Sequence, residues 1–303
     1  MNQKTLIVIV GPTAVGKTSV SIELAKKLNC EIMSCDSRQF FKEMSIGTAK
    51  PTVEEMDGVP HHFIDSHSIH TPYSVGDFER EGLEKLNQLF QKNDTAIMVG
   101  GSGLYVKAIC EGFDDFPDID SSIREGLITK AETEGIEPLQ KQLQELDPIH
   151  YEKMDTHNTQ RLIRALEVCI GTGKPYSSFT TNKTNKRPFN ILKIGITLDR
   201  ESLYKRINLR VDVMMKAGLL DEAKALYEYK NNNALQTVGY KELFDFFEKK
   251  TSLEQAIELI KQNSRRYAKR QMTWFKRDEE IHWFQPIELP LILEVIKKSG
   301  ITT

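Results

Sequence analysis

Residues 11–18 read G-P-T-A-V-G-K-T and directly follow an apolar run at 6–10. This is the pattern of a P-loop, whose two glycines let several backbone N–H groups point into one phosphate-holding concavity. The helix expected after it adds the positive end of its dipole, and Lys17 adds a point charge for the terminal phosphates. The Thr18 hydroxyl suits Mg²⁺. The chain is therefore expected to hold a di- or triphosphate, and the expected contacts are Gly11, Pro12, Thr13, Ala14, Val15, Gly16, Lys17 and Thr18.

Two further strand ends carry chemistry. Asp36 follows an expected strand at 31–34, and the turn Gly100–Gly103, which includes Ser102, follows a strand at 95–99. In an open parallel sheet, ligands gather at the carboxyl ends of the strands. In a nucleotide-hydrolysing P-loop protein, a buried strand usually ends in an aspartate that helps to hold Mg²⁺. Here the buried strand at 95–99 is followed by glycines instead. Simple nucleotide hydrolysis is therefore not expected, although the P-loop alone would suggest ATP.

Asp36 has two readings on the sequence alone. It is a turn or helix cap, as is common for aspartate before serine, or a base that takes a proton from a nucleophile aimed at the bound phosphate ester. Gln39, three residues on, has the donor and the acceptor needed to read a nucleobase edge.

Strand signals alternate with helix signals in the first third of the chain. Strands are expected at 5–10, 31–34 and 95–99, and helices at 17–28 and 75–91. This order predicts an α/β fold, a P-loop parallel sheet with helices on both faces.

The pattern then changes. An acidic loop is expected at 114–120, a mostly helical stretch without a strand signal from 122 to about 171, and a polar loop at 180–188. A strand is expected at 190–198, and everything from 201 on is expected to be helical. We therefore expect a core made of 1–112 and 191–303, and an all-helical insertion domain at 113–190.

Composition narrows the class of protein. The 303 residues are 39% hydrophobic and 28% charged with a net charge of −2, so any nucleic-acid binding must come from local patches. There is no signal-peptide pattern and no apolar run long enough to span a bilayer. The cysteines lack metal-site spacing, which favours reduced thiols and a cytoplasmic location; they are Cys30, Cys35, Cys110 and Cys169.

Two stretches are candidates for RNA contact. Residues 261–277 contain seven basic residues, three aromatic residues and no acid, and Gln160, Arg161 and Arg164 share one face of a helix in the insertion. In both cases the alternative is an ordinary solvated helix face. The histidines at 61, 62 and 67 fit no zinc spacing, so a structural or substrate-lining loop is expected there.

Short segments along almost the whole chain, in the same order, resemble the bacterial tRNA dimethylallyltransferases (tRNA isopentenyltransferases). These segments are the P-loop at 11–18, D-S-R-Q at 36–39, I-G-T-A-K-P at 46–51, P-H-H-F-I-D at 60–65, Y-S-V-G-D-F at 73–78, G-G-S-G-L-Y at 100–105, Q-R-L-I-R-A-L-E-V at 160–168, G-L-L-D-E at 218–222, G-Y-K-E-L at 239–243 and R-R-Y-A-K-R-Q-M-T-W-F at 265–275.

The resemblance implies transfer of a dimethylallyl group from dimethylallyl diphosphate to N6 of the adenosine just 3′ of the tRNA anticodon, position 37. The P-loop then holds the prenyl diphosphate, with Mg²⁺ bound through Thr18, and Arg210 also contacts the diphosphate. Asp36 matches the general base. Ser102 stands near the reacting amine, where the family more often has threonine.

The resemblance also implies a tRNA surface on a cytoplasmic enzyme, expected to be a monomer. The implied contacts are Asp36, Ser37, Arg38, Gln39, Ser102, Arg124, Gln160, Arg161, Leu162, Ile163 and Arg164. Three alternatives stay open: a P-loop kinase, an isopentenyltransferase acting on a free adenine nucleotide, and a non-enzymatic RNA-binding module. The last would leave Lys17, Thr18 and Asp36 without a role.

Overall fold

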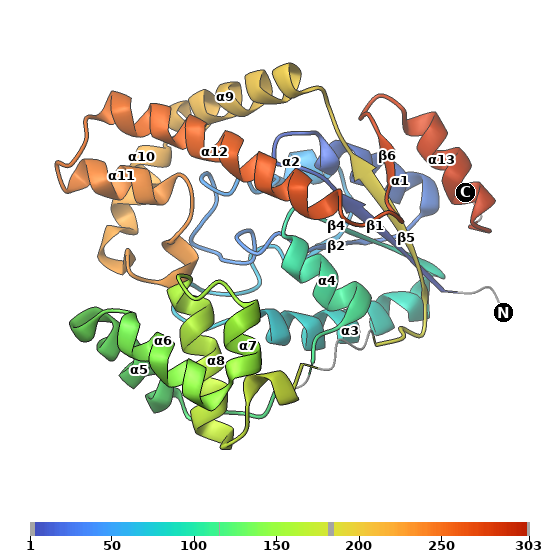
Figure 1. Ribbon diagram of the computed structural model, residues 1–303. Coiled ribbons are helices and arrows are strands. Elements are labelled where there is room, and N and C mark those ends of the chain that lie inside the picture. The colour runs from blue at the N-terminus through green and yellow to red at the C-terminus, as the bar shows by residue number, and fades with distance from the viewer. Residues whose placement is uncertain (1–3, 115, 181–184, 302–303) are drawn as a thin grey trace. The chain divides into compact units, whose positions relative to one another are not determined.

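The computed structural model describes residues 4–114, 116–180 and 185–301. Within these ranges the strands form one six-stranded sheet in the order β3-β2-β4-β1-β5-β6, with every pair parallel (Figure 1). This confirms the predicted α/β fold. The strands are β1 (Thr5–Val10), β2 (Ile32–Ser34), β3 (His61–His62), β4 (Thr95–Gly100), β5 (Asn190–Ile196) and β6 (His282–Phe284).

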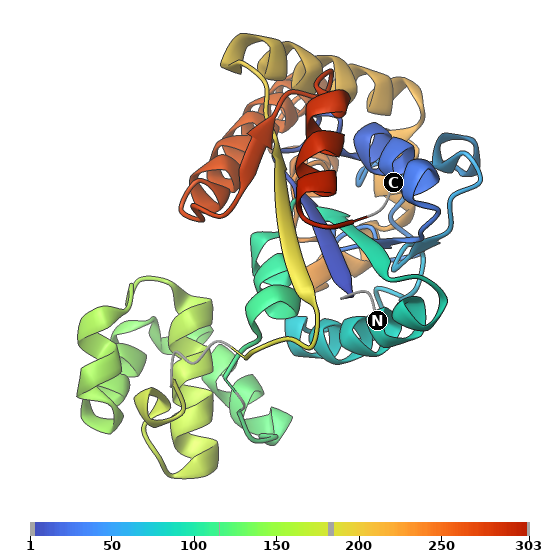
Figure 2. The same ribbon diagram turned by 90° about the vertical axis from the view of Figure 1, so that its right-hand side faces the viewer.

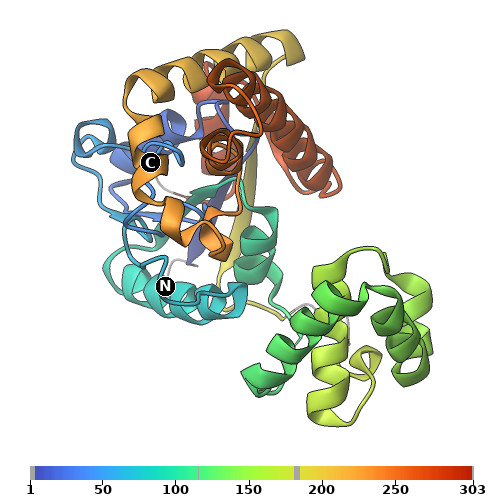
Figure 3. The ribbon, with the colours of Figure 1, turned by 90° about the vertical axis from the view of Figure 1, so that its left-hand side faces the viewer.

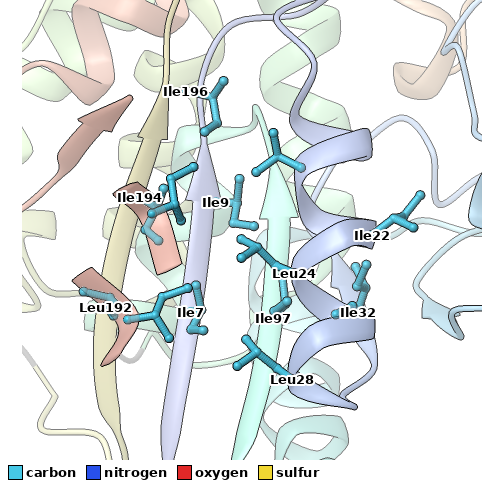
Figure 4. Close-up of a cluster of buried hydrophobic side chains, with 14 of the residues drawn as sticks. Ile7, Ile9, Ile22, Leu24, Leu28, Ile32, Ile97, Leu192, Ile194 and Ile196 are labelled. Carbon is cyan, nitrogen blue, oxygen red and sulfur yellow. The ribbon is translucent and has the colours of Figure 1, made fainter. Parts of the chain in front are cut away.

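Strand β1 lies at the centre of the sheet, and its residues are buried on both faces. Successive side chains of a strand point to opposite faces, so Ile7 and Ile9 lie on one face while Leu6 and Val8 lie on the other. Figure 4 shows Ile7 and Ile9 packed between β5 and the helix α1 (Lys17–Leu28), which contributes Leu24. An apolar run without alternation is typical of such doubly covered strands.

The two faces are covered by different helices, as the side view in Figure 2 shows. On the Ile7 side the core includes residues of α1, α9 (Arg200–Lys216) and α13 (Leu289–Lys298). On the Leu6 side it includes residues of α3 (Val75–Lys92) and α4 (Gly103–Glu111). Serine and aspartate at Ser74 and Asp77 form a capping box that fixes the start of α3.

A third apolar cluster joins the later helices (Figure 3). It unites α10 (Leu219–Ala225), α11 (Tyr240–Phe247) and the first half of the long helix α12 (Leu253–Phe275) with the loop after β2, where the short helix α2 (Val53–Met56) also lies. The second half of α12 continues to both faces of the sheet, because Ala268 belongs to one sheet core and Phe275 to the other.

Residues 112–185 form a separate compact unit made of helices. Its own core is built from leucines and other apolar residues of α5, α6 and α8, including Leu139, Leu143, Leu162 and Leu166. The helices are α5 (Ser121–Glu134), α6 (Glu137–Leu146), α7 (Pro148–Lys153) and α8 (Thr159–Thr172).

The sequence predicts an insertion at 113–190, whereas the compact helical unit covers 112–185. The difference at the far end has a physical reason. Arg187 bonds to Glu79 and to the Ile109 carbonyl, and Phe189 packs against Phe90, so the last residues of the predicted insertion belong to the sheet unit.

The strand at 5–10 and the helix at 17–28 are confirmed residue for residue. The prediction that the chain is entirely helical from 201 on is wrong, because His282–Phe284 forms strand β6 beside β5. The segments β3 and β6 are two and three residues long, too short to show a period.

Candidate active site

The P-loop connects β1 to α1 and leaves the start of α1 open. Gly11 has φ +149, and a β-carbon there would stand 2.3 Å from the Ile196 carbonyl oxygen, so only glycine fits. Gly16, with φ +106, is the N-cap of α1. Among the described residues no side chain caps this helix end, and its first turn has no acid. The free N–H groups and the helix dipole therefore favour an anion there.

Three basic side chains surround this helix end. The Lys17 ammonium donates to the Pro12 carbonyl at 2.8 Å. From α9, Arg210 donates to the Thr13 hydroxyl at 3.3 Å, and one helical turn earlier Arg206 donates to the Val15 carbonyl at 3.1 Å. The resemblance had pointed to Arg210 but not to Arg206; its i, i+4 spacing from Arg210 was the available signal.

The charges at the site act on one another. Burial lowers the pKa of Lys17 to about 8, the Asp36 carboxylate works against this, and the charge of Arg210 adds to the lowering. Burial also lowers the pKa of Arg210. Burial without a full counter-charge disfavours the positive form. An anion seated here restores the balance.

The strand order brings the three predicted strand ends together. Strand β4 lies between β2 and β1, so the turn at 100–103 lies between the P-loop and Asp36. The backbone of the Asp36 loop is tied to β4 by the bond from Cys35 N–H to the Val99 carbonyl at 2.8 Å. The sequence prediction that these ends meet at one edge is confirmed.

Asp36 caps a turn, and its role as a base stays a prediction. Its Oδ1 accepts the Arg38 N–H at 3.2 Å, which is the turn-capping bond of an aspartate at this position. A carboxylate has further lone pairs, so this bond does not exhaust its capacity to accept a proton. The side chain is half-buried and lies close enough to Lys17 and Arg210 to act on the pKa of both.

Ser102 faces the Asp36 loop. Its Oγ accepts the Ser37 N–H at 3.1 Å and lies 3.2 Å from the Ser37 hydroxyl. From α12, Tyr267 lies beside Ser102, close enough for the two side chains to act on each other. Burial and the nearby Asp36 charge raise the pKa of Tyr267 to about 12, so the phenol stays protonated at neutral pH. Tyr267 was counted only as part of a basic aromatic stretch in the sequence.

The side-chain amide of Gln39 forms hydrogen bonds within the protein, and its predicted contact with a nucleobase stays a prediction. Its side-chain nitrogen donates to the carbonyls of Thr48 and Ala49, both at 3.2 Å. Both amide hydrogens are therefore occupied in holding the loop after β2, and reading a nucleobase edge would require breaking these bonds.

The same loop is anchored by Glu222 of α10, which the sequence analysis did not single out as a site residue. Its carboxylate accepts three backbone N–H groups, from Ser45 at 3.0 Å, Ile46 at 2.8 Å and Gly47 at 2.9 Å. The Tyr240 hydroxyl donates to it at 2.7 Å. The resembling segments at 46–51, 218–222 and 239–243 thus meet at one carboxylate.

We expect Glu222→Ala to lower the free energy of unfolding by about 3 kcal/mol, because four donors lose one charged acceptor. Urea denaturation followed by circular dichroism measures it. Tyr240→Phe, which removes only one of the four bonds, is the matched comparison and is expected to cost about 1 kcal/mol. Equal stability of wild type and Glu222→Ala would mean that the loop is held by other contacts.

In the helical unit, α8 separates the implied tRNA contacts into two groups. Gln160 and Arg161 are exposed, whereas Leu162 and Ile163 are 0% and 5% exposed and lie in the core of the unit. The side chains of Leu162 and Ile163 are therefore not available to an RNA. Successive residues of a helix point in different directions, so a contiguous motif cannot present all of its side chains on one face.

Arg124 and Arg164 share one acidic partner. Arg124 donates to Glu167 at 2.9 Å, and Arg164 forms an ion pair with the same carboxylate at 3.2 Å and also lies over the Phe116 ring. Their side chains remain 42% and 41% exposed, while Glu167 is 8% exposed. The carboxylate thus fixes two guanidinium groups that still face solvent.

The helix α12 presents a basic surface. Trp274 is 40% exposed and Phe275 is 3% exposed, which places the first at the surface and the second in the core. A hollow on this surface is lined by Arg266, Lys269, Arg270, Thr273, Trp274 and Arg277.

Two histidines of the loop that was predicted to be structural or substrate-lining have partners within the protein. His62 pairs with Glu31 at 2.6 Å, and His61 Nδ1 lies 2.8 Å from the Val59 carbonyl oxygen. Throughout the part of the chain that the structure describes, no group of three or more His, Cys, Asp and Glu side chains is arranged to hold a metal. Nor does any described helix have the length and apolar character needed to cross a bilayer.

Taken together, the parallel sheet, the open helix end with Lys17, and the carboxylate at the next strand end define a P-loop enzyme. The family model "IPP transferase" matches residues 39–278, and the chain belongs to this family of transferases.

Named relatives agree with the family match. The chain is 57% identical to the tRNA dimethylallyltransferase of Christiangramia forsetii over 92% of this chain and 93% of the relative. It is 56% identical to that of Flavobacterium johnsoniae, over 93% of each chain.

Among solved structures, the tRNA isopentenylpyrophosphate transferase of Bacillus halodurans matches with a TM-score of 0.72 and 40% identity, covering 98% of this chain and 96% of that chain. A eukaryotic dimethylallyltransferase described as acting on tRNA matches with a TM-score of 0.78 and 30% identity, covering 93% of this chain and 74% of that chain.

Proposed function

We propose that this enzyme transfers the dimethylallyl group of dimethylallyl diphosphate to N6 of the adenosine 3′ of the anticodon, position 37, in tRNA. The observation that carries the proposal is the meeting of two features at one edge of the sheet, in a chain of the IPP transferase family. One is a diphosphate cradle, made of the P-loop with Lys17 and Arg210. The other is the Asp36 carboxylate, which follows β2, the second strand from β1 in the sheet. The named relatives are tRNA dimethylallyltransferases, which supports the acceptor.

In the proposed reaction, the adenosine N6 attacks C1 of the dimethylallyl group. The N6–C1 bond forms as the C1–O bond breaks, and the electron pair leaves with the diphosphate. An exocyclic amine of adenine is a poor nucleophile, so a positioned base matters, and Asp36 takes the N6 proton. The adenosine must leave its stack to reach Asp36, as is general for enzymes that modify a base.

The leaving diphosphate is stabilised by Lys17, Arg210 and the N–H groups at the start of α1. The Thr18 side chain is exposed beside this helix end, and its hydroxyl is a hard oxygen ligand of the kind that Mg²⁺ prefers. Thr18 and the diphosphate oxygens would hold Mg²⁺, which would supply further charge neutralisation of the diphosphate. Ser102, which accepts the Ser37 N–H, holds a hydroxyl for the reacting amine.

The decisive experiment incubates the enzyme with labelled dimethylallyl diphosphate in two separate reactions. One contains tRNA as the acceptor and the other contains AMP. We expect label in tRNA and none in AMP; label in AMP alone would overturn the tRNA acceptor. A P-loop kinase would instead transfer phosphate from ATP. Neither alternative is favoured, because the relatives are tRNA-modifying enzymes and the helical unit carries solvent-facing arginines suited to a polymer.

We further propose that Gln160, Arg161, Arg164 and Arg124 of the helical unit contact the anticodon loop. Arg161→Ala is expected to raise the KM for tRNA by roughly fivefold to thirtyfold. It should also reduce, by about one, the steepness with which the logarithm of the tRNA binding constant falls with the logarithm of the salt concentration. The KM for dimethylallyl diphosphate should not change. Lys141→Ala removes an exposed charge from α6 of the same unit and serves as the control. An equal effect of both variants would mean that Arg161 acts only through net charge.

The enzyme is proposed to act as a monomer in the cytoplasm, the compartment that holds its tRNA substrate. Sedimentation with and without tRNA tests the first point.

A further inference from the structure

The buried Gln271 of α12 bridges the two halves of the active site. It is 6% exposed, and its side-chain Oε1 accepts the Thr13 N–H of the P-loop at 2.9 Å. Its Nε2 donates to the Gly101 carbonyl, in the turn that carries Ser102, also at 2.9 Å. One side chain thus spans from the diphosphate cradle to the loop that faces Asp36.

We propose that Gln271 is a positioning residue that sets the distance and orientation between the bound diphosphate and the Ser102 turn. This inference rests on the proposed function for its reaction, but the geometry stands without it. The reacting carbon is attached to the diphosphate and the reacting amine lies on the Asp36 side, so the two halves must keep a fixed register.

The surroundings show that the bridge requires this residue type. A β-carbon at residue 101 would stand 2.2 Å from Gln271 Nε2, so the absence of a side chain there is what allows the amide to approach. The bridge needs an acceptor toward Thr13 and a donor toward Gly101 on one terminal group, and the glutamine amide supplies both whatever the pH. A carboxylate in its place would face the Gly101 carbonyl with a second acceptor.

The bridge also bears on the diphosphate ligands. The Thr13 N–H is bonded to Gln271, so this backbone group holds the shape of the P-loop instead of binding the diphosphate. The Thr13 hydroxyl meanwhile accepts from Arg210 at 3.3 Å. Gln271 and Arg210 therefore hold Thr13 from two helices, α12 and α9.

The test compares Gln271→Met with Asn93→Leu. Methionine keeps the length and volume of glutamine but neither hydrogen bond. Asn93 is also a bridging amide, and it lies before the first residue of β4, at the opposite edge of the sheet from the site. Its Nδ2 donates to the Leu28 and Asn29 carbonyls at 3.2 Å and 2.8 Å, and its Oδ1 accepts the Thr95 N–H at 2.9 Å. We expect similar falls in Tm for the two variants. Gln271→Met should lower kcat by about tenfold to a hundredfold and weaken binding of inorganic diphosphate, with the KM for tRNA unchanged. Asn93→Leu should leave all three values unchanged.

A second variant, Gln271→Glu, gives a signature that lost packing cannot produce. Ionised, the new carboxylate accepts from Thr13 but repels the Gly101 carbonyl; protonated, it donates to that carbonyl and restores the bridge. The ratio of its kcat to that of wild type should therefore rise as pH falls, whereas the ratio for Gln271→Met should stay flat. If the kcat ratios of the two variants had the same pH dependence, the proposal would be overturned.

Binding of inorganic diphosphate, measured by calorimetry, separates the two proposals. If the wild-type enzyme transfers no prenyl group to tRNA, the proposed function fails, while a loss of diphosphate affinity in Gln271→Met still supports the bridge. If Gln271→Met binds diphosphate as wild type does and has an unchanged kcat, the bridge has no positioning role.

Discussion

Asp36→Ala is expected to lower kcat for prenyl transfer by about 10²–10⁴-fold, the usual contribution of a positioned base. Diphosphate binding should survive, because the variant removes a negative charge from beside the cradle and leaves Lys17 and Arg210 in place. Single-turnover transfer of labelled dimethylallyl groups measures the rate, and calorimetry with inorganic diphosphate measures the binding. Undiminished turnover in the variant would refute the assignment of Asp36 as the base.

A second substitution separates the two roles of this residue. Asp36→Asn retains an oxygen that can accept the Arg38 N–H, so the turn is preserved, but an amide cannot take a proton at neutral pH. If Asp36 is the base, the alanine and asparagine variants should lose activity to a similar extent. If the asparagine variant keeps most of the activity, the carboxylate serves the turn alone.

The sheet could be predicted where local signals were strong. The P-loop, the apolar run of β1 and the period of α1 agree with one another, and the structure has the bounds that they predict. Strand β6 could not be found in this way, because three residues carry no measurable period and its partner β5 lies some ninety residues earlier in the chain.

The residues of the site also differ in whether local sequence signals could predict them. Asp36, Lys17 and Ser102 follow strands, and the topology of a parallel sheet brings strand ends together, so their proximity follows from the order of elements. The role of Gln271 depends on contacts with Thr13 and Gly101, which are 258 and 170 positions away. No local pattern contains such contacts.

Resemblance extended the prediction but did not resolve individual side chains. It identified the segment 160–168, yet the structure places Leu162 and Ile163 in the core between Arg161 and Arg164. It identified D-S-R-Q, yet Gln39 uses both of its amide hydrogens within the protein. A motif can identify a functional segment without showing which of its residues stabilise the fold and which contact the substrate.

Lys17→Met is expected to lower kcat by roughly 10²–10³-fold, the effect of removing one preorganised donor from a developing negative charge. The same variant should be more stable than wild type at pH 7. Burial lowers the pKa of Lys17 to about 8, so in the free enzyme at pH 7 the protein carries a buried charge that favours unfolding. Urea denaturation of both proteins measures this difference.

The pH dependence of that difference has a definite sign. Between pH 8 and about 10.5 the unfolded chain holds the Lys17 proton while the folded enzyme has released it, so the stability contributed by this group rises with pH. The stability advantage of Lys17→Met should therefore be constant below pH 8 and shrink above it.

The affinity for diphosphate should depend on pH for the same reason. Bound diphosphate favours the charged lysine, so the wild-type affinity should fall above pH 8, with proton uptake on binding. This pH dependence of the affinity should vanish in Lys17→Met. A stability difference that does not change across this range would mean that Lys17 keeps an ordinary pKa in the folded enzyme and that the cradle is already balanced without its anion.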